Sequence, residues 1–178
     1  MPEGFTREKI VAALEELGRR LELSGERAEL YIVGGAAMAL AFARDRVTRD
    51  IDAVFVPKTR IYNEAEAMAV EDSSLGPDWL NDAVKGFLPQ VDDSKAQVML
   101  ERPGIRVLVA SPQRLLAMKI FAARVDRDRD DILTLCAEAN ISTIDEALDM
   151  TYDLYGELLT AKSRFLTIEL LQDSLPMS

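Results

Sequence analysis

Residues 29–57 constrain the fold of this chain more than any other stretch of its sequence. ELYIV, residues 29–33, is a short β-rich run that ends at Gly34-Gly35. AAMALAFA, residues 36–43, combines high helix propensity with almost no polar side chain, which predicts a short buried helix. DIDAVFVP, residues 50–57, is a second apolar strand. A strand, a glycine turn, a helix and a strand in this order predict a layered arrangement of sheet and helices.

Two further helices are expected on either side of this stretch. Apolar residues spaced by three or four predict an amphipathic helix over 6–23, with Thr6 as its N-cap. A second helix is predicted over 59–72, and the LGPDW sequence at 75–79 breaks the chain after it. Residues 81–94 show the least periodicity, which indicates a loop with a helical turn.

The remaining sequence predicts a strand pair followed by helices alone. AQVMLE (96–101) and GIRVLVA (104–110) flank a turn signal and predict a hairpin. Helices are expected at about 112–125, 128–139, 143–156 and 160–173, the third opened by a capping box of Thr143 and Glu146. We therefore predict an α+β fold: a small mixed β-sheet core flanked by helices in residues 1–110, and a helical C-terminal region, 111–178, packed on that core.

The 178 residues include no histidine and a single cysteine, Cys136. The absence of histidine excludes Ser-His-Asp and Cys-His catalysis and zinc sites that need His. Proton transfer must therefore use carboxylates, Lys, Tyr or water, and any metal ion is expected to be hard and oxygen-liganded. One cysteine allows no internal disulfide, and its apolar helical context, ILTLCAEA, predicts a core position.

The net charge of −10 argues against non-specific binding to DNA or other nucleic acids. A local basic patch could still meet a phosphate-rich substrate. The N-terminal residues show no apolar run behind a basic segment, so no signal peptide is expected. No stretch approaches the roughly 18 apolar residues of a membrane span. We expect a soluble, cytoplasmic protein without a membrane partner.

Two aspartates, Asp50 and Asp52, interrupt the apolar strand at 50–57. Residues i and i+2 of a strand point to the same face, so the two carboxylates are expected side by side. Like charges in such an arrangement repel unless a cation lies between them, and Mg²⁺ prefers one or two carboxylates together with substrate phosphates. The alternative is structural: Asp50 caps a turn and Asp52 faces water on an edge strand.

Gly34-Gly35 follows one strand and precedes the short helix. Backbone N–H groups at a helix start attract anions, and glycine lets a phosphate approach the chain closely. The alternative is a tight strand-to-helix turn without a ligand, and the glycine pair alone does not decide between them.

The combination GGAAMALAFARDRVTRDID resembles the nucleotidyltransferase superfamily of DNA polymerase beta. Its hallmark is a Gly-[Gly/Ser] followed about a dozen residues later by Asp-x-[Asp/Glu] on a strand. Gly34-Gly35 and Asp50-Ile51-Asp52 fit these positions. Arg46 and Thr48 fit the Arg-x-Thr-x-Asp-[Ile/Leu]-Asp variant of this motif. In this respect the sequence resembles the AbiEii-like and MenT-like toxin nucleotidyltransferases and a related uncharacterised bacterial group.

The segment SPQRLLAMKIFAARVDRDRDDILTL, residues 111–135, is similar to a downstream Ser-x-x-x-Leu-x-x-Lys segment of the same families. The resemblance implies that Lys119 contacts the nucleoside triphosphate, whereas without it a lysine on an apolar helix is expected to snorkel to solvent. It also implies that Asp130 or, less strongly, Asp131 is an accessory site carboxylate. For Asp128 we favour a solvated position at a helix start.

The superfamily usually carries a third carboxylate on a later strand, often as the base for the attacking hydroxyl. The matching strand of this chain, GIRVLVAS, contains none. Glu101, Asp130 or Asp131 could replace it, or the base could be missing.

The resemblance implies transfer of a nucleoside monophosphate from a nucleoside triphosphate (NTP) to a hydroxyl, with release of pyrophosphate. Asp50 and Asp52 would hold two Mg²⁺ ions, Gly34 and Gly35 would cradle the phosphates, and Lys119 would neutralise charge on the leaving pyrophosphate. Arg46 would brace the carboxylates or the triphosphate, and Thr48 would position its loop. The implied acceptor is a tRNA 3′ end or a protein, within a toxin–antitoxin or phage-defence system that could include a cognate antitoxin.

Two other functions stay open at this point. The domain could be a catalytically silent binding module, which the missing strand carboxylate favours and the intact glycine and aspartate motifs disfavour. It could also be an enzyme that nucleotidylates a small molecule such as an aminoglycoside, which the net charge of −10 permits.

Overall fold

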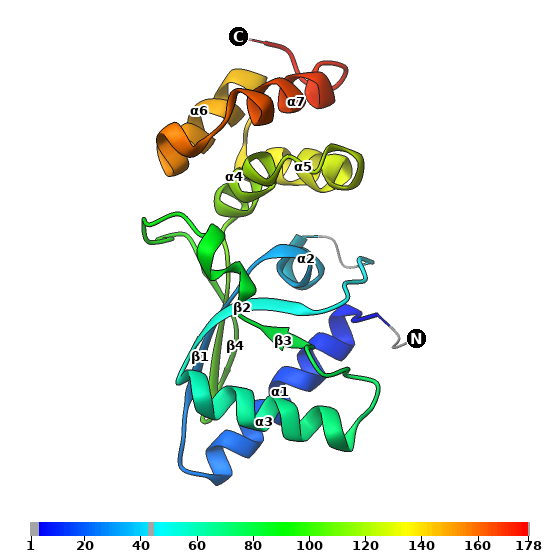
Figure 1. The fold of residues 1–178 in the computed structure, drawn as a ribbon, viewed down its shortest axis with the longest axis vertical. Helices are drawn as coiled ribbons and strands as arrows, with labels where there is room; N and C mark the ends of the chain where they lie inside the picture. Colours follow the sequence, from blue (N-terminus) through cyan, green and yellow to red (C-terminus); the bar gives the residue numbers. More distant parts are fainter. Residues whose placement is uncertain (1–3, 43–44, 178) are drawn as a thin grey trace. The chain divides into compact units, whose positions relative to one another are not determined.

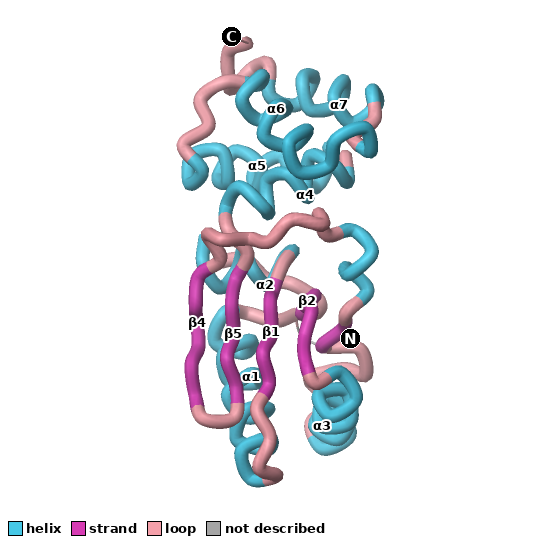
Figure 2. Tube along the Cα trace, turned by 90° about the vertical axis from the view of Figure 1, so that its left-hand side faces the viewer, coloured by secondary structure: helices cyan, strands magenta, loops and turns pink. Residues whose placement is uncertain are grey.

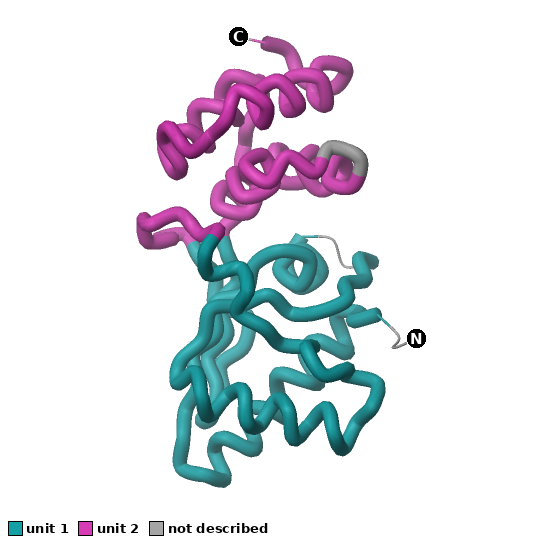
Figure 3. Tube along the Cα trace, in the orientation of Figure 1, with its two compact units in different colours: residues 1–86, 96–110 teal, residues 87–95, 111–178 magenta. Residues whose placement is uncertain are grey.

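The structure, a computed structural model, describes residues 4–42 and 45–177 (Figure 1). The chain forms two compact units (Figure 3): unit 1 contains residues 1–86 and 96–110, and unit 2 contains residues 87–95 and 111–178. Residues 87–95 therefore belong to the helical unit, whereas the sequence placed them with the sheet.

Unit 1 is built around a five-stranded mixed sheet with the strand order β3-β2-β1-β5-β4. The strands are β1 (Ala28–Ile32), β2 (Ile51–Val56), β3 (Leu80–Asn81), β4 (Gln97–Arg102) and β5 (Ile105–Val109). Strand β1 runs antiparallel to β2 and parallel to β5, β2 runs parallel to β3, and β4 runs antiparallel to β5. Figure 2 shows β4, β5, β1 and β2 side by side in this order. The predicted α+β class with a small mixed sheet is confirmed.

The predicted helices of unit 1 are present. Helix α1 (Arg7–Leu23) begins after Thr6, whose hydroxyl accepts a hydrogen bond from the Lys9 amide, and helix α3 (Lys58–Glu71) follows β2. Helix α2 (Gly34–Ala37) continues into a π-helical turn over Met38–Phe42. The helix thus begins at the glycine pair and not after it, while Ala43, the last residue of the predicted helix, lies outside the described residues.

The two faces of the sheet differ in burial. In β1, Ala28, Leu30 and Ile32 are buried, whereas Glu29 is exposed and Tyr31 is half-buried. Helix α1 packs against β5 and α3, which places the buried face against these helices. Alternation with a period of two follows from the pleat of a strand. The second face carries the even-numbered side chains of β2, including Asp52.

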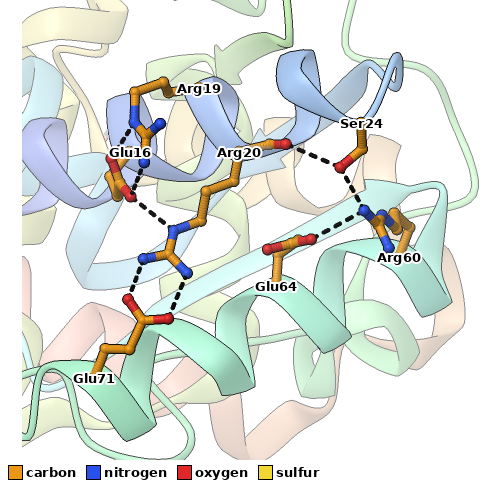
Figure 4. Close-up of polar contacts among 7 residues, drawn as sticks. All are labelled: Glu16, Arg19, Arg20, Ser24, Arg60, Glu64 and Glu71. Atoms are coloured by element: carbon orange, nitrogen blue, oxygen red, sulfur yellow. Dashed lines mark hydrogen bonds and ion pairs between the residues drawn. The ribbon is translucent and has the colours of Figure 1, made fainter.

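A polar network on the surface of unit 1 joins α1 to α3 (Figure 4). The Arg20 guanidinium donates hydrogen bonds to both carboxylate oxygens of Glu71 and, over 2.7 Å, to Glu16. Arg60 on α3 donates to the Ser24 hydroxyl at the end of α1. Hydrogen bonds from Arg19 and Arg20 lower the pKa of Glu16 to about 2, so this carboxylate is ionised throughout the neutral range.

Unit 2 contains the four helices predicted at the end of the chain. They are α4 (Pro112–Ala122), α5 (Val125–Ala139), α6 (Ile144–Tyr155) and α7 (Ala161–Leu171), and α4 contacts each of the other three. The predicted capping box is confirmed: Thr143 accepts from the Glu146 amide, and the Glu146 carboxylate accepts from the Thr143 amide.

The aperiodic segment 87–95 is tied to the start of α4. The Arg114 side chain is only 4% exposed and donates hydrogen bonds to the carbonyl oxygens of Pro89 and Val91. The Ser111 amide donates to the Asp93 carboxylate over 2.8 Å. These hydrogen bonds from a buried arginine to two backbone carbonyls connect the loop to the start of α4.

Candidate active site at the start of strand β2

Asp50 and Asp52 lie at the start of β2, but only Asp52 belongs to the strand. The strand begins at Ile51, one residue later than predicted, so Asp50 occupies the bend before it. Both aspartates are half-buried, whereas Ile51 between them is fully buried. The buried Ile51 fixes which way the strand faces, and Asp52 consequently projects from the opposite face of the strand.

Gly34 lies directly against the Asp52 carboxylate. A Cβ atom at Gly34 would be 3.1 Å from Asp52 Oδ2, and the Gly34 φ of +64° is in the left-handed region that favours glycine. The Val33 amide also donates to the Asp52 carbonyl over 3.0 Å, which pins the end of β1 to β2. The first glycine is therefore required both by its backbone conformation and by the approach of the aspartate.

Gly35 faces the second predicted motif, Arg46 and Thr48. A Cβ atom at Gly35 would lie 2.6 Å from Thr48 Oγ1 and 3.9 Å from Arg46 Nε. The Thr48 hydroxyl donates to the Asp50 carbonyl over 3.3 Å, which ties this loop to the aspartate motif. Phe5 and Thr48 exchange both backbone hydrogen bonds, of 2.7 and 3.0 Å, so the N-terminal segment holds the loop in place.

Six of the predicted site residues therefore come together in unit 1, although up to 18 positions separate them in the sequence: Gly34, Gly35, Arg46, Thr48, Asp50 and Asp52. Strand pairing between β1 and β2 folds the chain back on itself and produces this arrangement.

The donor set suits a hard divalent cation that also binds phosphate. Mg²⁺ takes one or two carboxylates and completes its octahedral shell with water and substrate phosphates. Asp50 and Asp52 supply such a pair, and the Asp52 carboxylate lies beside Gly34. Within residues 4–42 and 45–177, no group of three or more His, Cys, Asp or Glu is arranged to hold a metal ion without a substrate.

Lys119, Asp128 and Asp131 form a separate ion cluster in unit 2. The Lys119 ammonium group lies 2.8 Å from Asp128 Oδ1 and 2.7 Å from Asp131 Oδ2, and its side chain is 12% exposed. The expectation of a solvated Asp128 is wrong: this residue is 8% exposed and Asp131 is 4% exposed, because both face the lysine. Asp130 lies on the exposed side of α5, and within the described part of the chain no ion pair joins it to Lys119.

Glu101 does not replace the missing strand carboxylate. It pairs with Arg27 and Arg106, and the strand register aligns it through β5 and β1 with Val56, at the opposite end of β2 from Asp52. At about 3.3 Å per residue and about 4.8 Å per strand, Glu101 is roughly 19 Å from Asp52. Strand β5 itself contains no acidic residue. This alternative is therefore excluded.

Sequence reasoning missed Asn81, which lies beside both aspartates. Strand β3 pairs with β2 so that Asn81 is in register with Asp52, and its amide nitrogen is 3.4 Å from Asp50 Oδ2. The two residues of β3 are too few for a periodic signal, and the apolar Trp79-Leu80 pair before Asn81 is too short to predict a strand.

A hollow in unit 1 lies elsewhere, between α1 and α3, with a volume of about 530 Å³. It is lined by side chains such as Lys9, Glu16, Arg20, Met68 and Glu71, and by none of the predicted site residues.

A mixed sheet flanked by helices, with a glycine pair set against an Asp-x-Asp motif, defines the nucleotidyltransferase class. The chain belongs to the family described as "Nucleotidyltransferase of unknown function (DUF6036)", whose model matches residues 8–167. No curated protein matches the sequence.

Among solved structures, the chain is similar to an antigenic nucleotidyltransferase-like protein from Paracoccidioides brasiliensis. The two are 14% identical, with a TM-score of 0.43, over 96% of this chain and 91% of that chain. No helix among the described residues is both long and apolar enough to cross a lipid bilayer.

Proposed function

We propose that this protein is an active Mg²⁺-dependent nucleotidyltransferase that moves a nucleoside monophosphate from an NTP to a hydroxyl acceptor. The observation that carries the proposal is the contact between Gly34 and the Asp52 carboxylate, 3.1 Å from the Cβ position of the glycine. It brings the glycine pair and the aspartate motif to one point, in a chain of a nucleotidyltransferase family.

Each site residue has a defined task in this reaction. Asp50 and Asp52 hold Mg²⁺, which when bound polarises the α-phosphate and lowers the pKa of the acceptor hydroxyl. The first amides of a helix lack intrahelical acceptors, so those of Gly34 and Gly35 can donate to phosphate oxygens. Arg46 offers a guanidinium fork for the triphosphate, and Thr48 orients the loop that carries both Arg46 and Asp50.

The acceptor oxygen forms a bond to the α-phosphorus as the bond to the bridging oxygen of the β-phosphate breaks. Pyrophosphate leaves with the electron pair, and the hydroxyl proton passes to solvent, since β5 offers no carboxylate. Lys119 would neutralise charge on the pyrophosphate, for which its ammonium group would have to leave the ion pairs with Asp128 and Asp131. Asp130, which is exposed on α5, would contact the nucleotide.

The resemblance to AbiEii-like and MenT-like toxins suggests the acceptor. We propose a tRNA 3′ end or a protein hydroxyl as substrate, in a cytoplasmic toxin–antitoxin or phage-defence system with a cognate antitoxin. The second candidate function is a catalytically silent binding module. The absence of an acidic side chain in β5 and the engagement of Lys119 by two carboxylates favour this candidate.

The test is transfer of label from each NTP to bulk tRNA or protein in the presence of Mg²⁺. The Asp50→Ala/Asp52→Ala double variant is expected to lose the transfer. The matched control is Asp149→Ala/Asp153→Ala, which removes two exposed carboxylates from α6 and changes the net charge equally. Transfer that survives in the Asp50/Asp52 variant sinks the metal assignment. Wild-type protein that binds Mg²⁺ and NTP but transfers no label supports the silent module.

A further inference from the structure

We propose that Asn81 is a positioning residue that holds the Asp50 carboxylate in the orientation needed for the metal–nucleotide site. This inference rests on the proposed function. Asn81 is the second residue of β3, lies in register with Asp52, and places its amide nitrogen 3.4 Å from Asp50 Oδ2. Among residues 4–42 and 45–177, it is the one hydrogen-bond donor that reaches the Asp50 carboxylate.

The orientation of the Asn81 amide is determined at both ends. Its carbonyl oxygen, Oδ1, accepts a hydrogen bond of 3.1 Å from the Ala83 amide, and only its NH₂ group can donate to a carboxylate. Because the Ala83 bond engages Oδ1, the NH₂ group is turned toward Asp50. If the amide were reversed, its oxygen would face the Asp50 carboxylate and its NH₂ group would face the Ala83 N–H. Neither hydrogen bond could then form.

The strand that carries Asn81 is anchored on both sides of it. Before Asn81, the buried Trp79 donates its indole N–H to the Ala65 carbonyl over 3.0 Å, and its own carbonyl accepts from the Ile51 amide over 2.7 Å. After Asn81, the Asp82 carboxylate accepts a hydrogen bond of 2.6 Å from the Tyr62 hydroxyl and pairs with Lys58.

The Lys58 ammonium group, and after it the Tyr62 hydroxyl, lowers the pKa of Asp82, so the anchor stays charged. Asn81 therefore sits on a rigid support fixed to α3, not on a free loop.

Asp50 needs such a support because it precedes β2. Asp52 is oriented by the pleat of its strand, whereas Asp50 lies in a bend where no strand pairing sets its direction. A neutral amide orients the carboxylate without cancelling its charge, which a lysine or arginine at the same place would do. Partners of this kind fix metal ligands, and their loss typically weakens metal binding about 10- to 100-fold.

The experiment compares full-length wild type with Asn81→Ala and Asn81→Ser. Serine can still accept from the Ala83 amide in a short turn but is too short to donate to Asp50, so it separates the two hydrogen bonds. Gln97→Ala is the control, since Gln97 is an exposed amide on β4. Two quantities are measured: Mn²⁺ affinity of the protein alone, and the Mg²⁺ midpoint of thermal stabilisation by ATP and by GTP.

Both Asn81 variants are expected to weaken Mn²⁺ binding and raise the Mg²⁺ midpoint about 10-fold, with Gln97→Ala unchanged. A midpoint within twofold of wild type in both variants overturns the inference, even if their melting temperatures fall. A shift of the midpoint in Asn81→Ala but not in Asn81→Ser also overturns the inference, because loss of the hydrogen bond from the Ala83 amide would then explain the effect. If wild type binds Mn²⁺ but is not stabilised by nucleotide, the proposed function is wrong. The role of Asn81 is then judged from the Mn²⁺ affinities of the variants alone. Wild type that shows neither overturns both.

Discussion

Replacing Gly35 by alanine tests whether the glycine pair is packed against the loop that carries the aspartates. The new Cβ atom would lie 2.6 Å from Thr48 Oγ1 and 3.1 Å from Thr48 Cβ. Ordinary contacts between such atoms are about 3.5–4.0 Å, so the overlap with the hydroxyl is roughly 1 Å. Thr48 cannot retreat as a whole, because Phe5 holds its backbone through hydrogen bonds of 2.7 and 3.0 Å.

The cost follows from what Thr48 must give up. Rotation of its stiff β-branched side chain breaks the hydrogen bond to the Asp50 carbonyl, worth about 1 kcal/mol, and residual overpacking costs about 1–3 kcal/mol. The reduced entropy of the unfolded chain returns about 0.4–1 kcal/mol. We therefore expect Gly35→Ala to lower the free energy of unfolding by about 2 kcal/mol.

Urea unfolding followed by fluorescence measures this effect in the right unit, since the only tryptophan, Trp79, is buried in unit 1. Gly86→Ala is the control: no atom lies within 4 Å of its Cβ position, so it should be neutral or slightly stabilising. Thr48→Ala removes the clashing hydroxyl, and the double variant with Gly35→Ala should recover about 1 kcal/mol relative to the sum of the single changes. Equal stability of Gly35→Ala and Gly86→Ala, or strict additivity with Thr48→Ala, would refute the reasoning.

Three further predictions concern other parts of the chain. Lys119→Met leaves Asp128 and Asp131 buried without their cation and should lower the free energy of unfolding by about 3–5 kcal/mol; unchanged thermal unfolding would contradict the buried cluster. The pKa of Glu16, lowered from 4.5 to about 2, implies stability that is present above pH 4.5 and lost as the pH falls toward 2. Glu16→Gln should flatten that part of the stability curve, and an identical acid slope in both proteins would disprove it. Burial raises the pKa of Cys136 to about 11, so a disulfide reagent at pH 8 should modify it only as the protein unfolds; rapid labelling of the native protein would rule this out.

Sequence reasoning succeeded where the signal was local. The capping box at Thr143 and Glu146 and the helix start at Thr6 depend on neighbours three residues apart, and both are present as predicted. The β4–β5 hairpin was readable from two β-rich runs around a turn. Sequence reasoning failed for β3, because two residues carry no periodicity. It also failed for Asp128, because the sequence of a helix start does not reveal that a lysine nine positions earlier will pair with it.

For the candidate site, the sequence alone determined which residue types are present and what chemistry they permit: two aspartates with one residue between them, a glycine pair, and no histidine. Their common location depended on the tertiary structure, because the antiparallel pairing of β1 and β2 brings Gly34 against Asp52 and Gly35 against Thr48. The structure alone also showed that the Asn81 amide lies within hydrogen-bond distance of Asp50 and that Glu101 lies at the far end of the sheet. The physical reason is strand register: it sets which distant residues become neighbours, and it is decided by the packing of whole strands and not by any short stretch of chain.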